Sequence, residues 1–496
     1  MIKDQFYKDV LKKIALISIT LIMCRLTYGI WGWVLALAGV VFAVKLDYAK
    51  LTFCYLMFAL IAVFNPVISG MTLQLGLSAR AGNLLLAIFL MLGGAASRAE
   101  RERLPVHWIF VYMLVAVISS IDGWFPMISY LKLAQFFGFI LGILLISNVM
   151  QKSDKGLYDL RCTIMAVAVI MIVGSLMAKF VPTIGYSMTF TRMAKIGIDY
   201  QVEDFFLADK TQLFNGMTMH SQMLAPVISI LATWVLCDMI LVEKKVRLLH
   251  IGLLSITPVL LYLSRSRGGF LTLVVTMGLT IFICMPNARL PRRIKNHLSN
   301  IIMVGAFLLI GAGVYFQVKD GTISKWLRKT DDVVGDQRTL SEAMTSSRMG
   351  LIEENMRDFY LNPFLGKGFQ VMPWLKDAYG NGFITWYSAP VEKGVTPVVI
   401  LGETGLLGGI VFLAFLCTFY STCMRRRYFA LMNMFTCTLI ANLADSTLFS
   451  PAGLGGFLWV MSCIGGFGID LITMRINIQK QALDSQVRDV TRMGLQ

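Results

Sequence analysis

The stretch that decides the fold is His250–Cys284, HIGLLSITPVLLYLSRSRGGFLTLVVTMGLTIFIC. In it a short polar element, Ser264–Gly269 (SRSRGG), separates an apolar run at 250–263 from a second apolar run at 270–284. Apolar runs of this kind predict membrane helices, although both are shorter than the ~20 residues that a full span needs. The stretch therefore predicts two helices joined by a polar turn at the membrane boundary.

The polar turn is itself a candidate functional site. Arg265, Ser266 and Arg267 place two guanidinium groups and a hydroxyl at the boundary. Placing such groups at the boundary costs free energy unless they bind an anion or hydrogen-bond to an ordered backbone. The alternative is that the arginines are interfacial anchors that reach to lipid phosphates, and the stretch alone leaves both interpretations open.

The whole chain has the composition of a polytopic membrane protein. Of its 496 residues 56% are hydrophobic and 15% are charged, which is too little charge to cover a soluble globule. We expect an all-α fold with about fourteen transmembrane helices. The apolar runs that predict them lie at 14–30, 31–45, 51–67, 82–96, 107–122, 132–149, 160–180, 219–242, 248–264, 268–285, 298–316, 396–421, 427–446 and 452–474.

The basic residues predict the orientation, because short loops rich in Lys and Arg stay in the cytoplasm. If alternate connections are inside, the inside segments hold 26 of the 45 Lys and Arg, and the short outside loops hold only Arg80. The inside segments are 1–13, 45–50, 97–106, 150–161, 243–247, 286–297, 422–428 and 475–496. Both termini are then cytoplasmic. The net charge of +16 follows largely from this asymmetry, so it indicates no nucleic acid partner.

The chain divides into membrane segments and loops. In order these are N-terminal transmembrane helices (1–180), an outside loop (181–218), transmembrane helices with the Ser-Arg-Ser-Arg-Gly element (219–316), a large outside loop (317–395), C-terminal transmembrane helices (396–474) and a cytoplasmic tail (475–496). The nine cysteines form no Cys-x-x-Cys or Cys/His cluster and none falls in an outside loop. We therefore expect neither a disulfide framework nor a metal site.

The outside loop at 317–395 is typical of a functional segment, since its 79 residues far exceed a connector. Thr345–Leu361 has apolar residues at helical spacing and stops before a proline, which predicts an amphipathic helix. Ser346 or Ser347 would cap this helix, so that Arg348 would lie in its first turn. The positive charge of an arginine there is unfavourable beside the positive end of the helix dipole unless the arginine binds an anion. The alternative interpretation is that Arg348 forms a salt bridge with an acidic neighbour.

Three other features of the predicted outside face are candidates. His220, at the start of a span, is the only histidine on that face. Pro363–Gly368 predicts a glycine-rich turn. Glu403 lies within the apolar run that contains Leu401–Gly409, and an acid there is a functional candidate, although the glycines around it equally indicate close helix packing.

These elements, in this order, resemble the O-antigen ligase and polysaccharide polymerase superfamily of bacterial envelope glycosyltransferases. The resemblance extends over about residues 210–410 and rests on the order and common outside placement of its motifs. The matching motifs are hydroxyl-x-Ser-Arg-Gly (Ser264–Gly268), Ser347-Arg348, Pro-x-x-Gly-x-Gly (Pro363–Gly368), Leu-x-Glu-x-Gly-Leu-Leu-Gly (Leu401–Gly408) and, more loosely, Gly-x-x-x-His-Ser-Gln (Gly216–Gln222).

The resemblance implies transfer of a glycan from undecaprenyl diphosphate to a lipid or glycan hydroxyl, without a metal or other cofactor. The expected site faces the periplasm or cell exterior from the bacterial inner membrane. Arg267 and Arg348 match the family's functional arginines, and both are assigned to the diphosphate, which gains negative charge as the glycosidic bond breaks. Further substrate-binding candidates are Arg265, Ser266, His220, Lys393 and Glu403.

One departure from the family bears on the activity. The ligases carry a histidine about nine residues before the Glu of the Leu-x-Glu-x-Gly motif, and here that position is Gly394. Glu392 is our first candidate for the general base in its place and His220 the second. The missing histidine favours a polymerase of O-antigen or exopolysaccharide repeat units, with a chain-length regulator as a candidate partner, over a ligase that transfers the glycan to lipid A core.

A membrane transporter is the alternative of another class, because intramembrane charges can line a pathway. Transporters commonly have two related halves, and residues 1–240 show no correspondence with residues 241–496.

Overall fold

The computed structural model of the protein describes residues 2–27, 30–45, 47–61, 63–64, 82, 85–89, 103–180, 214–218, 221–243, 246–264, 266–287, 340–373, 394–444, 446–451 and 453–493. The α-helices are α1 (Ile2–Leu26), α2 (Ile30–Val44), α3 (Tyr48–Ile61), α5 (Trp108–Ser119), α6 (Pro126–Met150), α7 (Asp154–Phe180), α10 (Ser221–Cys237), α11 (Leu248–Leu263), α12 (Arg267–Leu279), α15 (Leu340–Leu361), α18 (Thr396–Arg426), α19 (Phe429–Ala444), α20 (Leu454–Val460) and α21 (Phe467–Met493). Three π-helical turns, η1 (Asp238–Val242), η2 (Thr280–Cys284) and η4 (Met461–Gly466), and a 3-10 turn, η3 (Met285–Asn287), continue these helices.

The described residues form no β-strand, and their β-pairing is one isolated bridge between Phe64 and Thr218. Five helical segments are long and apolar enough to cross a membrane, namely Pro126–Met150, Asp154–Phe180, Gln222–Val242, Thr396–Arg426 and Leu454–Gln486. Six shorter apolar helices accompany them. The expectation of an all-α membrane protein is thus confirmed, whereas the number of about fourteen spans stays a prediction. The predicted span at 298–316 and most of that at 82–96 lie outside the described residues.

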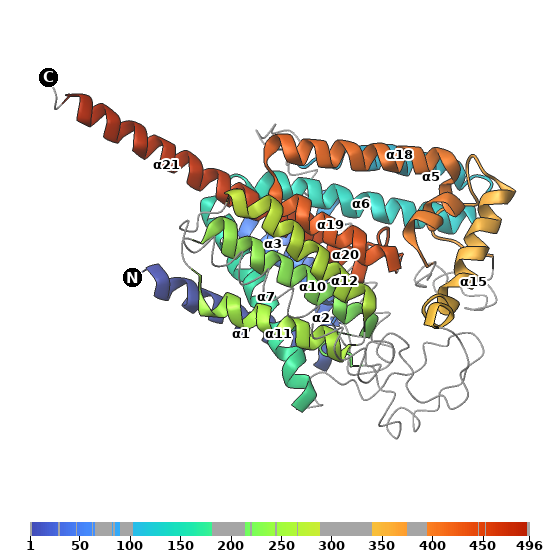
Figure 1. Ribbon diagram of the computed structural model, residues 1–496, viewed down its shortest axis with the longest axis horizontal. Coiled ribbons are helices and arrows are strands. Elements are labelled where there is room, and N and C mark those ends of the chain that lie inside the picture. Colours follow the sequence, from blue (N-terminus) through green and yellow to red (C-terminus); the bar gives the residue numbers. More distant parts are fainter. Residues whose placement is uncertain are drawn as a thin grey trace.

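Many of the helices, among them α6 and α18, lie along the long axis of the molecule, whereas α15 lies across it (Figure 1). The N-terminus and the C-terminal part of α21 lie at one end, which we call the terminal end. The helix α15 lies at the opposite end, which we call the loop end, and α12 and α18 both begin there (Figure 1). The helices α5 and α18 run antiparallel, since the Ser119 hydroxyl at the end of α5 donates to the carbonyl oxygen of Glu403 near the start of α18.

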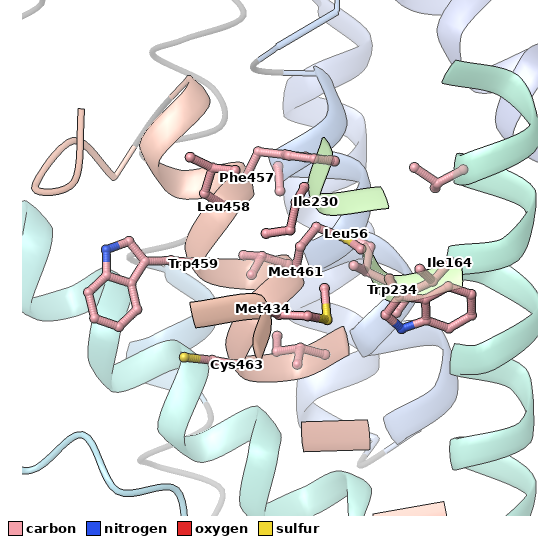
Figure 2. Close-up of a cluster of buried hydrophobic side chains, with 14 of the residues drawn as sticks. Leu56, Ile164, Ile230, Trp234, Met434, Phe457, Leu458, Trp459, Met461 and Cys463 are labelled. Atoms are coloured by element: carbon pink, nitrogen blue, oxygen red, sulfur yellow. The ribbon is translucent and has the colours of Figure 1, made fainter. Parts of the chain in front are cut away.

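The hydrophobic core joins helices from all parts of the chain (Figure 2). Leu56 of α3, Ile164 of α7, Trp234 of α10, Met434 of α19 and Trp459 of α20 meet in it. Both indole N–H groups donate to main-chain carbonyl oxygens, so burial leaves neither of them unpaired. Segments far apart in the sequence therefore share one core.

A buried charged network lies toward the terminal end. Arg161 of α7 donates to Asp238 of η1 through Nε (2.6 Å) and Nη2 (2.9 Å), and it also pairs with Glu243. His250 Nε2 of α11 lies 3.0 Å from the second oxygen of Asp238. The guanidinium carbon of Arg161 lies 4.7 Å from the ring centroid of Phe6 on α1. Charges that are at least nine-tenths buried must be paired, so this network ties four helical elements together.

Candidate functional site

The Pro363–Gly368 turn, which follows α15, docks against the first part of α18. Four main-chain hydrogen bonds make the junction: Lys367 N–H to Gly402 O (2.9 Å), Gly368 N–H to Glu403 O (3.1 Å), Leu406 N–H to Pro363 O (2.8 Å) and Leu407 N–H to Phe364 O (3.2 Å). Two motifs about 35 residues apart in the sequence therefore meet at the loop end. We call this the turn–helix junction.

Glycines permit the two backbones to come this close. Gly405 has φ 64° and ψ −163°, a non-helical conformation that kinks α18 and that only glycine adopts readily. A Cβ at Gly405 would lie 2.3 Å from the carbonyl carbon of Phe364. Gly366, with φ 70°, would place a Cβ 2.4 Å from the carbonyl carbon of Glu403. The predicted turn is thus present, and its glycines serve a direct contact between main chains.

The end of α5 completes the junction. The Ser119 hydroxyl donates to the carbonyl oxygen of Glu403, and the Ser120 hydroxyl accepts the N–H of Phe369 (3.3 Å). Both serines are fully buried. The ammonium of Lys367 lies 3.4 Å from the carboxylate of Asp122, which is largely exposed. Three segments far apart in the sequence are therefore joined by polar contacts at one place.

The carboxylate of Glu403 faces the inside of this junction. Its side chain is 2% exposed, and Oε1 accepts the N–H of Gln370 at 2.9 Å. The carbonyl oxygen of Gln370 accepts from the ammonium of Lys132 on α6 at 3.0 Å. Glu403, a predicted substrate-binding residue, thus holds the main chain of Gln370 in this structure.

The helix α15 packs on α18 beside the junction. A Cβ at Gly402 would lie 2.8 Å from the carbonyl oxygen of Asn355, and one at Gly394 would lie 3.2 Å from Cβ of Leu351. Gly394, with φ 82°, occupies the position where the resembling ligases carry histidine. A side chain at this φ would be strained, so the local backbone suits glycine there.

The predicted start of α15 is wrong. The helix begins at Leu340 and not at Ser346 or Ser347, because helix-forming residues such as Glu342 precede the serines. Arg348 therefore lies in the third turn, where the helix dipole has no local effect. At this position the arginine needs no anion to offset the helix dipole. The side chain of Arg348 lies outside the described part of the structure.

The Ser-Arg-Ser-Arg-Gly element forms the start of α12. Ser266 is the N-cap, and its hydroxyl accepts the N–H of Gly269 at 3.4 Å. Arg267 is the first helical residue. Gly269 lies against Ala225 of α10, where a Cβ would be 2.2 Å from the alanine Cβ. The serine that we predicted to bind substrate therefore has a capping role in this structure.

The segment that leads to His220 is also anchored. The N–H of Met217 donates to the hydroxyl of Ser175 on α7 (3.1 Å), and Gly216 has φ 55°. The following span begins at Ser221, as the apolar pattern predicted to within two residues. These contacts bring Gly216 and Met217 to the last part of α7.

Several candidates lie outside the described residues. These are Arg265, His220, Glu392 and Lys393, together with the side chain of Arg267. The start of α12 and the helix that carries Arg348 both lie at the loop end (Figure 1). The convergence of the two guanidinium groups on one ligand stays a prediction.

Sequence reasoning missed Lys132 and Gln370. Lys132 opens the apolar run predicted at 132–149, and an intramembrane lysine is a signal that could have been used. It is 4% exposed. Gln370 carries no such signal, because a positive φ at glutamine is not apparent from the sequence.

The fold and these contacts define a helical membrane protein with a polar, glycine-rich junction at one end of its bundle. No group of three His, Cys, Asp or Glu side chains among the described residues could hold a metal ion. The chain matches no protein-family model and shows no significant similarity to a curated protein.

Proposed function

We propose that the protein is a bacterial inner-membrane glycosyltransferase that polymerises surface polysaccharide repeat units. Its substrate is a glycan carried on undecaprenyl diphosphate, and the acceptor is a hydroxyl of a second lipid-linked unit. In this proposal about fourteen helices span the membrane. Both termini are cytoplasmic, and the loop end faces the periplasm.

The observation that carries the proposal is the turn–helix junction. It joins the Pro363–Gly368 and Leu401–Gly408 motifs by four main-chain hydrogen bonds, at the end of the bundle where α12 begins. These are the motifs on which the resemblance to polysaccharide polymerases and ligases rests. Their meeting in space supports a common site, because catalytic groups from distant segments must be held in a fixed geometry.

The proposed chemistry needs no metal. An acceptor hydroxyl oxygen bonds to the anomeric carbon as the bond from that carbon to the phosphate oxygen breaks. The diphosphate leaves with the electron pair, and the hydroxyl proton passes to a general base. We assign the base to Glu392 and the stabilisation of the departing diphosphate to Arg267 and Arg348, since fixed guanidinium groups stabilise developing negative charge.

The test is a glycan assay with arginine variants. Arg267→Ala and Arg348→Ala should each abolish long-chain product while membrane insertion stays normal. Lysine at either position should also fail, because an ammonium lacks the planar fork of guanidinium. Arg425→Ala, at the exposed far end of α18, is the matched control and should keep wild-type chain length. Wild-type chain length in both arginine variants would refute the site.

A deletion strain separates the alternatives within the class. Loss of long chains on the lipid carrier indicates a polymerase, whereas long chains that accumulate on the carrier indicate a ligase acting on lipid A core or another acceptor. Unchanged glycans in both pools would refute glycosyl transfer and leave the transporter.

A further inference from the structure

Gln370 has an unusual backbone conformation at the turn–helix junction. Its φ is +52°, in the left-handed region that residues with a side chain rarely adopt. A glycine would meet the same geometry without strain. A side chain kept in such a conformation suggests that the side chain itself has a function.

Two oppositely charged groups hold this conformation. Oε1 of Glu403 accepts the N–H of Gln370 at 2.9 Å, and Nζ of Lys132 donates to its carbonyl oxygen at 3.0 Å. The glutamate is 2% exposed and the lysine 4% exposed. Hydrogen bonds to charged groups are stronger than neutral ones, so the main chain of Gln370 is fixed on both sides.

Gln370 is less buried than the residues on either side of it. Phe369, Val371 and Met372 are 0%, 1% and 0% exposed, whereas Gln370 is only half-buried. Of residues 369–372, Gln370 is thus the one that keeps exposed surface.

Three buried polar residues lie in the first half of α6. Ser129, Lys132 and Gln135 recur every three residues and are all at least nine-tenths buried. The Ser129 hydroxyl and the Gln135 amide nitrogen have no hydrogen-bond partner among the described residues. A Cβ at Gly368 would lie 3.5 Å from that hydroxyl, so the polar side of α6 borders the segment that holds Gln370.

We propose that Gln370 is a substrate-contact residue whose carboxamide binds sugar hydroxyls of the glycan, and that Lys132 and Glu403 are positioning residues that fix its main chain. This inference rests on the proposed function, and it names the part of the substrate that the junction recognises. A carboxamide offers both a donor and an acceptor, which match a pair of adjacent hydroxyl groups without a charge. The two positioning residues do not touch the glycan.

The experiment measures glycan transfer by the purified full-length protein in lipid vesicles, over a concentration series of lipid-linked oligosaccharide. Gln370→Gly removes the amide but suits the positive φ, so the fold should keep its thermal stability. Loss of two neutral hydrogen bonds should raise KM about tenfold with little change in kcat. Gln370→Asn keeps an amide and tolerates this φ, so it should recover part of the loss.

The positioning residues are tested by rescue and by non-additivity. Glu403→Gln keeps an oxygen acceptor for the Gln370 N–H and should have a KM near that of the wild type, whereas Glu403→Leu should raise it. In the Gln370→Gly background Glu403→Leu should add little, because the side chain that it positions is absent. Lys132→Met is the second variant for this test, should Glu403→Leu fail to fold.

The outcomes separate this inference from the function on which it rests. An active wild type with an unchanged KM in Gln370→Gly overturns the substrate contact and leaves the glycosyltransferase standing. Additive effects in the double variants overturn the positioning roles. A folded wild type that transfers no glycan overturns the proposed function, and this inference with it.

Discussion

Gly405→Ala tests whether the turn–helix junction is held together as its geometry indicates. With φ 64° and ψ −163°, the backbone of Gly405 is in a region that is essentially restricted to glycine. Holding alanine there costs about 1–3 kcal/mol. By itself this penalty shifts the equilibrium between the docked and the undocked turn by roughly 5-fold to 150-fold. A Cβ 2.3 Å from the carbonyl carbon of Phe364 adds a clash with main chain, which has no rotamer to relieve it.

Gly409→Ala on the same helix is the matched control. A Cβ there would lie 3.2 Å from the terminal methyl of Leu401, a flexible side chain that can yield. We expect Gly405→Ala to lose long-chain glycan and to denature at a lower temperature in detergent, whereas Gly409→Ala keeps both properties. Thermal unfolding and the glycan ladder measure the two effects. Equal stability and activity in both variants would refute the account of the junction.

Two more substitutions test how the helices are held. Asp238→Ala leaves buried Arg161 without its main partner and should lower the free energy of unfolding by about 3–5 kcal/mol, measured by thermal unfolding. The double variant Asp238→Leu/Arg161→Met removes both charges and should lose much less stability. An equal loss in the two variants would contradict the role of charge pairing. Gly269→Ala forces α12 away from Ala225 and should lower the thermal stability. Gly278→Ala is the control, because no atom lies within 4 Å of the Cβ that it adds, and it should leave the stability unchanged. Equal stability of the two variants would contradict the close contact of α10 and α12.

Apolar runs predicted the helices well, because a membrane segment must satisfy its backbone internally and bury its apolar side chains. The run at 248–264 became α11 (Leu248–Leu263), and that at 396–421 became α18 (Thr396–Arg426). The polar tail is helical as well. The helix α21 continues without a break from the last apolar run to Met493.

The junction could be predicted only in its parts. Glycine spacing predicted the turn after α15 and close packing around Glu403, but main-chain bonds between segments 35 residues apart depend on the packing of α5, α15 and α18 together. The positive φ of Gln370 could not be predicted either, because tertiary contacts set it and glutamine has no local preference for that conformation. Serines before Arg348 resembled a cap, yet the helix-forming residues ahead of them prevailed.

The place of Arg348 within α15 depends on how this helix packs. In the third turn the helix dipole neither opposes nor favours the arginine, so the contact of α15 with α18 decides where position 348 lies. Position 348 is three residues before Leu351, which borders Gly394, and seven before Asn355, which borders Gly402 of α18, so the three positions share a helical face. It then lies about 10 Å along the axis from the contact of Asn355 with Gly402. Under the proposed function the arginine and the junction act on one ligand only while this packing holds, so we expect a side chain at Gly402, whose Cβ would lie 2.8 Å from the carbonyl oxygen of Asn355, to lower activity as well.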